Sequence, residues 1–128
     1  MKDIDLPVGL NKKEILKLYQ GDWNHASIIF ETFLKEIPTE LNQLQFNIDK
    51  SDWIKVKNIL HKIKPSFAMV GLGIIESQIQ DIEELIKSTP FDELMIKSEL
   101  AKLFSTIKSS QKIVEKAQID LSHLVNSI

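Results

Sequence analysis

Apolar residues recur every three or four positions along almost the whole of this 128-residue chain. In its last third Ile96, Leu100, Leu103 and Ile107 follow this spacing, which places them on one face of a helix. No stretch alternates apolar and polar residues as a half-buried strand does. The chain also has only 4 Gly and 4 Pro, too few for the many turns of an all-β protein. The pattern predicts an all-α fold.

The helix-breaking and capping residues divide the chain into five expected helices. These cover residues 11–20, 23 to about 46, 52 to about 70, 74–87 and from 90 onward. We expect Asp22, Ser51 and Thr89 as N-caps, and Pro38 to bend the second helix without ending it. Short connections between long amphipathic helices make consecutive helices antiparallel neighbours. The prediction is an up-and-down antiparallel four-helix bundle with a short extra N-terminal helix, in a single domain over residues 1–128.

Composition excludes several classes of protein. Cysteine is absent, which excludes disulfides and thiol chemistry and favours a reducing, cytoplasmic location. No segment reaches the roughly 20 apolar residues of a membrane span, and the N-terminus has no signal-peptide pattern. The 16 basic residues are balanced by 18 acidic ones without a dense basic cluster, so no nucleic acid is expected as a partner. The three histidines lack metal-ligand spacing, and no metal or cofactor is expected.

The stretch "HKIKPSFAMVGL", residues 61–72, combines a histidine with a proline in an otherwise apolar helix. At about 100° per residue, His61 faces away from the apolar arc that contains Leu60 and Ile63. Lys57 and Lys64 lie four before and three after His61, so both reach toward its ring. Two ammonium groups there suit an attached phosphoryl dianion. Plain solvation of these lysines is the alternative, and for Lys57 it is the favoured one.

An acidic partner for His61 follows from counting. If the chain reverses near Leu72, residues equally far from it lie side by side on adjacent helices. His61 is eleven residues before Leu72 and Glu83 eleven after it, so both lie about 16 Å from the turn. A carboxylate at Glu83 would accept a hydrogen bond from Nδ1–H and leave Nε2 free as a nucleophile. The alternative, an ordinary glutamate at the edge of the core, stays open.

These residues resemble the signature of histidine-containing phosphotransfer (HPt) domains. The motif is a histidine, any residue, an apolar residue, a lysine, usually a glycine, a small residue, and a glycine ten after the histidine. Its positions here are His61, Ile63, Lys64, Pro65 in place of the glycine, Ser66 and Gly71. The segment "LYQGDWNHASIIFETFLKEIPTELNQL" is similar to the family's second helix, and Trp53 precedes the histidine by eight residues, as in the family. The resemblance covers residues 10 to 125.

The resemblance implies a phosphorelay intermediate that is not an enzyme and does not bind ATP. His61 would carry the phosphoryl group on Nε2, Lys64 would assist it and Glu83 would hold the ring. The expected partners are response-regulator receiver domains, which supply Mg²⁺, and a hybrid sensor kinase; a monomer is expected. The receiver would dock on Ile54, Lys57, Pro65, Ala68, Met69 and Leu72, unless the short N-terminal helix covers part of this patch.

Two other functions would explain part of the sequence. The phosphoacceptor domain of a sensor histidine kinase also pairs histidine with proline, but there an acid follows the histidine and the proline comes five residues later. Here Lys62 follows His61 and the proline is Pro65. A structural helical adaptor would explain the apolar stripes but not a histidine, a lysine and a glutamate in register. Pro65 removes the hydrogen bond to the His61 carbonyl, and we expect the resulting bend to expose the histidine.

Overall fold

The computed structural model describes residues 4–126, and every regular element in that range is a helix. The ends of the predicted domain, residues 1–3 and 127–128, lie outside the described part of the chain. The helices are α1 (Lys12–Tyr19), α2 (Trp23–Asp49), α3 (Trp53–Met69), α4 (Gly73–Lys87) and α5 (Glu93–Asn126). The all-α prediction is confirmed.

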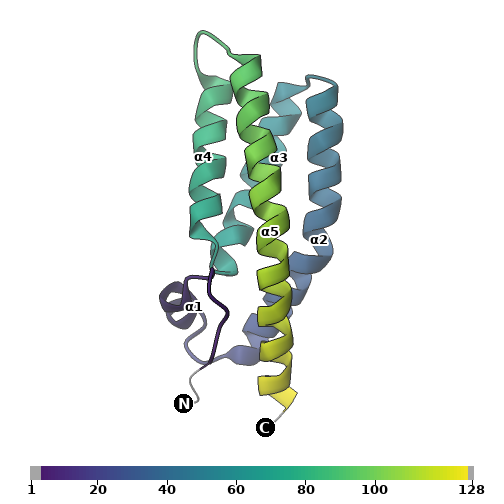
Figure 1. Cartoon of the computed structure of the whole chain (residues 1–128). Coiled ribbons are helices and arrows are strands. Elements are labelled where there is room, and N and C mark those ends of the chain that lie inside the picture. Colours follow the sequence, from purple (N-terminus) through teal and green to yellow (C-terminus); the bar gives the residue numbers. More distant parts are fainter. Residues whose placement is uncertain (1–3, 127–128) are drawn as a thin grey trace.

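Helices α2 to α5 form the antiparallel bundle and α1 lies at one end of it (Figure 1). α2 packs against α3 and α5, and α4 packs against α3 and α5, so each helix contacts its neighbours in the chain. α2 and α5 have 27 and 34 residues, whereas α3 and α4 have 17 and 15. The two long helices therefore extend past the α3–α4 turn, and α1 with the segment before it packs at that end (Figure 1).

Carboxylate and amide side chains cap four of the helices. Asn11, Asp22, Asp52 and Asp92 each accept a hydrogen bond from the backbone N–H three residues later, which satisfies one of the free donors at a helix start. The expected cap at Asp22 is therefore present. The expected caps at Ser51 and Thr89 are wrong.

At both incorrectly predicted caps, an aspartate further along the chain takes the capping position. Ser51 has a left-handed backbone with φ of 56° and lies in the turn before Asp52. α5 begins at Glu93 rather than Pro90, because the Asp92 side chain accepts from Met95 N at 3.1 Å. Helix α2 runs through Pro38, as expected, and continues to Asp49, past the predicted end.

The reversal between α3 and α4 is held by a contact with the N-terminal segment. Gly71 has φ of +80°, a conformation that glycine adopts without a Cβ penalty. Its carbonyl accepts a hydrogen bond from Asn11 N at 2.9 Å, and Tyr19 Oη donates to Met69 O at 2.6 Å. These contacts fix where the chain turns, and thus which residues of α3 and α4 face each other.

No helix in residues 4–126 combines the length and the apolar character needed to cross a membrane.

Candidate functional site

His61 lies on the outward face of α3. Its side chain is 76% exposed, whereas the flanking Leu60 and Ile63 are buried in the core. The apolar stripe of α3 thus anchors the helix by one face and leaves the imidazole on the other. This is the orientation that the helical phase predicts.

Glu83 is the acidic neighbour of His61. Its side chain is only 4% exposed, and its Oε1 atom lies 3.3 Å from His61 Nδ1. The ring is not aligned for a hydrogen bond, and Oε1 accepts none from any other described residue. A buried carboxylate oxygen without a donor is costly, so this atom is placed to accept a hydrogen bond from His61 Nδ1–H if the ring rotates into line. Counting placed Glu83 at the edge of the core, whereas the structure buries it.

Lys64 turns toward Glu83 rather than over the His61 ring. Its Nζ atom lies 3.0 Å from Glu83 Oε2 and donates to Gln80 Oε1 at 2.6 Å. Gln80 in turn donates from Nε2 to Glu84 Oε1 at 2.9 Å. The Lys64 side chain is 17% exposed, so this ammonium group lies between α3 and α4.

Three pairs across α3 and α4, and a fourth between α3 and the connection after α4, share one register. Each pair consists of residues equally far before and after Leu72 in the sequence. The pairs are Lys64 with Gln80, His61 with Glu83, Lys57 with Lys87, and Trp53 with Phe91. The same count that located Glu83 would have located Gln80, Lys87 and Phe91, which sequence reasoning missed.

A depression of about 300 Å³ opens beside His61. It is lined by Lys57, Asn58, His61, Glu83 and Lys87. Neither Lys57 nor Lys87 has an ion-pair partner among residues 4–126. Two unpaired ammonium groups next to an exposed imidazole make the depression suitable for an anion.

An apolar hollow of about 400 Å³ adjoins this depression and shares Lys57 and Lys87 with it. Its apolar lining comes from Trp53, Ile54, Ile86 and Phe91. The Trp53 and Phe91 rings meet edge to face with their centroids 5.7 Å apart. Ile54 is 76% exposed, so this hollow offers apolar surface to a partner about two turns of helix from His61.

The residues predicted to dock a receiver do not all reach the surface. Ile54, Pro65 and Met69 are exposed, while Lys57 and Ala68 are half-buried. Leu72 is 6% exposed and belongs to the core, so its assignment to the docking patch is wrong. The reason is that the segment before α1, through the Asn11–Gly71 hydrogen bond, covers the α3–α4 turn.

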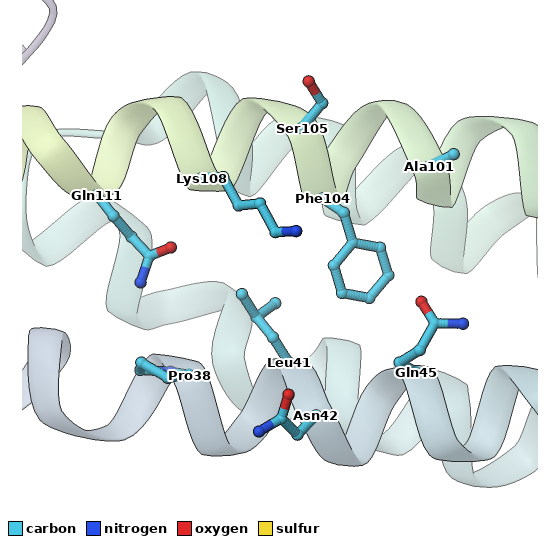
Figure 2. Close-up of a pocket in the computed structure, with 9 residues that line it drawn as sticks. All are labelled: Pro38, Leu41, Asn42, Gln45, Ala101, Phe104, Ser105, Lys108 and Gln111. Atoms are coloured by element: carbon cyan, nitrogen blue, oxygen red, sulfur yellow. The ribbon is translucent and has the colours of Figure 1, made fainter.

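A further hollow lies between α2 and α5 and shares no lining residue with the depression at His61. Figure 2 shows Phe104 and Leu41 facing each other across it, with the Lys108 side chain extending along it. Its volume is about 640 Å³, and it is lined by no histidine or carboxylate. It therefore lacks the imidazole and the carboxylate that line the depression at His61. Within residues 4–126 no cluster of three or more His, Cys, Asp or Glu side chains is arranged to hold a metal ion.

Comparison with protein families gives a match. A family model described as the Hpt domain matches residues 29–110, a range that includes His61, Lys64 and Glu83. No curated protein and no solved structure matches the chain.

Proposed function

The chain belongs to the Hpt domain family, and from this premise we propose that His61 Nε2 accepts a phosphoryl group from the aspartyl phosphate of one receiver domain and passes it to the aspartate of another. Members of this family transfer phosphoryl groups through a histidine in two-component phosphorelays and interact with receiver domains. The observation that supports His61 is its place: an imidazole 76% exposed, with Nδ1 3.3 Å from a buried carboxylate.

The proposed step is an in-line displacement at phosphorus. The Nε2 lone pair forms the N–P bond while the P–O bond to the aspartate breaks, and the aspartate leaves as a carboxylate. Nδ1 keeps its proton throughout, so the ring takes a positive charge when the phosphoryl group attaches. The Glu83 carboxylate at 3.3 Å offsets that charge and holds the ring so that Nε2 points outward. Transfer to the second receiver is the same step in reverse.

The phosphoryl oxygens would lie near Lys57 and Lys87. Both line the depression next to His61, and their charges favour the dianion on arrival. The receiver would supply Mg²⁺ and most of the stabilisation of the transferring group, so the chain would act as a carrier that needs no ATP site. The apolar hollow formed by Trp53, Ile54, Ile86 and Phe91 would extend the docking surface for the receiver, together with Pro65, Ala68 and Met69.

We also propose that the donor receiver belongs to a hybrid sensor kinase and that the chain acts as a cytoplasmic monomer. The lack of cysteine supports a reducing compartment.

The test is phosphoryl transfer from a purified phosphorylated receiver. The wild-type chain should gain an acid-labile, base-stable phosphoryl group, and His61→Gln should gain none. His25→Gln and His123→Gln are matched controls, because both histidines are exposed and far from His61 in the sequence; both variants should be labelled like wild type. Labelling of His61→Gln at the wild-type rate would overturn the proposal, as would labelling of the wild type by ATP alone.

The role of the two lysines is tested by salt dependence. The double variant Lys57→Met/Lys87→Met should accept the group more slowly, and its rate should fall less steeply with ionic strength than that of wild type. Lys116→Met removes an exposed charge on α5 and should leave both properties unchanged. An equal salt dependence in all three proteins would remove Lys57 and Lys87 from the site.

A further inference from the structure

The Lys64 ammonium is already committed within the protein. It lies 3.0 Å from Glu83 Oε2 and 2.6 Å from Gln80 Oε1, and only 17% of the side chain is exposed. The depression beside His61 is lined by Lys57 and Lys87, with no contribution from Lys64. Lys64 would have to leave both partners before it touched a group on His61 Nε2.

Glu83 connects Lys64 to His61, because its two oxygens have different neighbours. Oε2 accepts from Lys64, and Oε1 lies 3.3 Å from His61 Nδ1 with no other donor among residues 4–126. Because a carboxylate is planar, the bond from Lys64 to one oxygen of Glu83 limits the direction in which the other oxygen can point. The side chain is 4% exposed, so Lys64 is also the counter-charge that makes an ionised Glu83 tolerable in this position.

We infer that Lys64 is a positioning residue that acts on His61 through Glu83 and does not contact the transferring phosphoryl group. Lys64 is the ion-pair partner of Glu83 and directs its Oε1 at Nδ1, and Gln80 keeps Lys64 in place by accepting its second hydrogen bond. The consequence for phosphoryl transfer rests on the proposed function of His61. The effect on the orientation and protonation of the His61 ring does not rest on that function, because it is measured in the unphosphorylated protein.

If Lys64 acts through Glu83, the effects of substitutions at these two residues are not independent. If Lys64 works only through the Glu83 charge, its loss matters in the wild-type background and has no further effect once Glu83 is neutral. A lysine in contact with the phosphoryl group would instead contribute the same factor in both backgrounds. Misplacement of the ring should slow transfer on the order of 10- to 100-fold.

The experiment compares Lys64→Met, Glu83→Gln and the double variant Lys64→Met/Glu83→Gln. Lys64→Met leaves a buried charge without a partner and can unfold the chain; the double variant removes both charges and keeps the comparison with Glu83→Gln available. Lys64→Arg keeps the charge and should restore most of the rate. Lys62→Met is the matched control, because Lys62 is also next to His61 but pairs with Glu40 at 2.8 Å.

Two readouts separate this inference from the proposed function. The first is the ¹⁵N chemical shifts of the His61 ring, which report how the proton is shared between Nδ1 and Nε2. Glu83→Gln and the double variant should share one altered pattern, while Lys62→Met and Lys64→Arg should resemble wild type. The second is the rate of phosphoryl transfer, where the double variant should match Glu83→Gln.

A double variant 10-fold or more slower than Glu83→Gln would overturn the inference, as would a ring pattern of the double variant that differs from that of Glu83→Gln. Failure of the wild type to accept a phosphoryl group would overturn the function instead, and the ring shifts would still decide the role of Lys64.

Discussion

Gly71→Ala is expected to destabilise the chain strongly, whereas Gly73→Ala, two residues away, is not. Gly71 has φ of +80°, and a Cβ built there lies 2.6 Å from Ile15 Cδ1 and 3.1 Å from Asn11 N. Gly73 starts α4, and apart from its chain neighbours and its own helix backbone no atom of residues 4–126 lies within 4 Å of its Cβ position. The two substitutions make the same chemical change in one turn but meet different surroundings.

The expected cost at Gly71 has two parts. The left-handed backbone costs a residue with a Cβ roughly 1–2 kcal/mol, and the displacement of Ile15 is an overpacking penalty of about 1–3 kcal/mol. Gly71→Ala should therefore lower the free energy of unfolding by about 2–5 kcal/mol. Gly73→Ala should be neutral or raise it by up to about 1 kcal/mol, because alanine favours the helix and restricts the unfolded chain.

Ile15→Val isolates the steric part, because it removes the Cδ1 atom that the new Cβ meets. Urea unfolding of both single variants and of Gly71→Ala/Ile15→Val gives the coupling energy. Ile15→Val alone should cost about 0.5–1.5 kcal/mol, but on the Gly71→Ala background it should cost less or stabilise. If Gly71→Ala lies within about 0.5 kcal/mol of wild type, the packing of α1 on the turn is not as described. If the two substitutions add, the cost does not arise at Ile15.

Three further outcomes are expected. Burial raises the pKa of Tyr19 to about 12, from about 10 in the unfolded chain. The stability that the neutral phenol contributes, at most about 3 kcal/mol, is complete below pH 10 and is lost by pH 12. The free energy of unfolding in urea should therefore fall more between pH 9 and 12 for wild type than for Tyr19→Phe. Pro65→Ala supplies the N–H missing opposite the His61 carbonyl, so thermal unfolding should show a stability higher by up to about 3 kcal/mol. If a bend at Pro65 exposes His61, phosphoryl transfer to this variant should also be slower, and an unchanged rate would refute that hypothesis. Leu72→Ala should lower the free energy of unfolding by about 2–5 kcal/mol, because Leu72 is 6% exposed. Ile54→Ala should lower it by under about 0.5 kcal/mol and should weaken receiver binding. Equal losses of stability would place the two side chains in the same environment.

The bundle could be predicted because each helix carries its own signal. Spacings of three and four define the buried stripes, and Asp22 shows where α2 begins through local hydrogen bonding. The predictions at Ser51 and Thr89 were wrong because serine and threonine also cap helices, serine about as well as aspartate. Which of several adjacent candidates takes the capping position depends on the backbone of the turn, such as the φ of 56° at Ser51, and this is not visible in composition.

Helical phase alone determined that His61 faces outward, and a symmetric count about Leu72 was enough to pair it with Glu83. Both depend only on the regular geometry of helices and on one reversal. The tertiary structure decided what the side chains do there. Lys64 is long and flexible, so its place on the helix allowed either the phosphoryl group or a carboxylate as its partner, and the burial of Glu83 selects the carboxylate. Leu72 was expected beside the outward face of the His61 helix, but the N-terminal segment packs over the turn and buries it. The periodicity of one helix says which face is apolar, and only the packing of other segments determines how much of the remaining surface stays open.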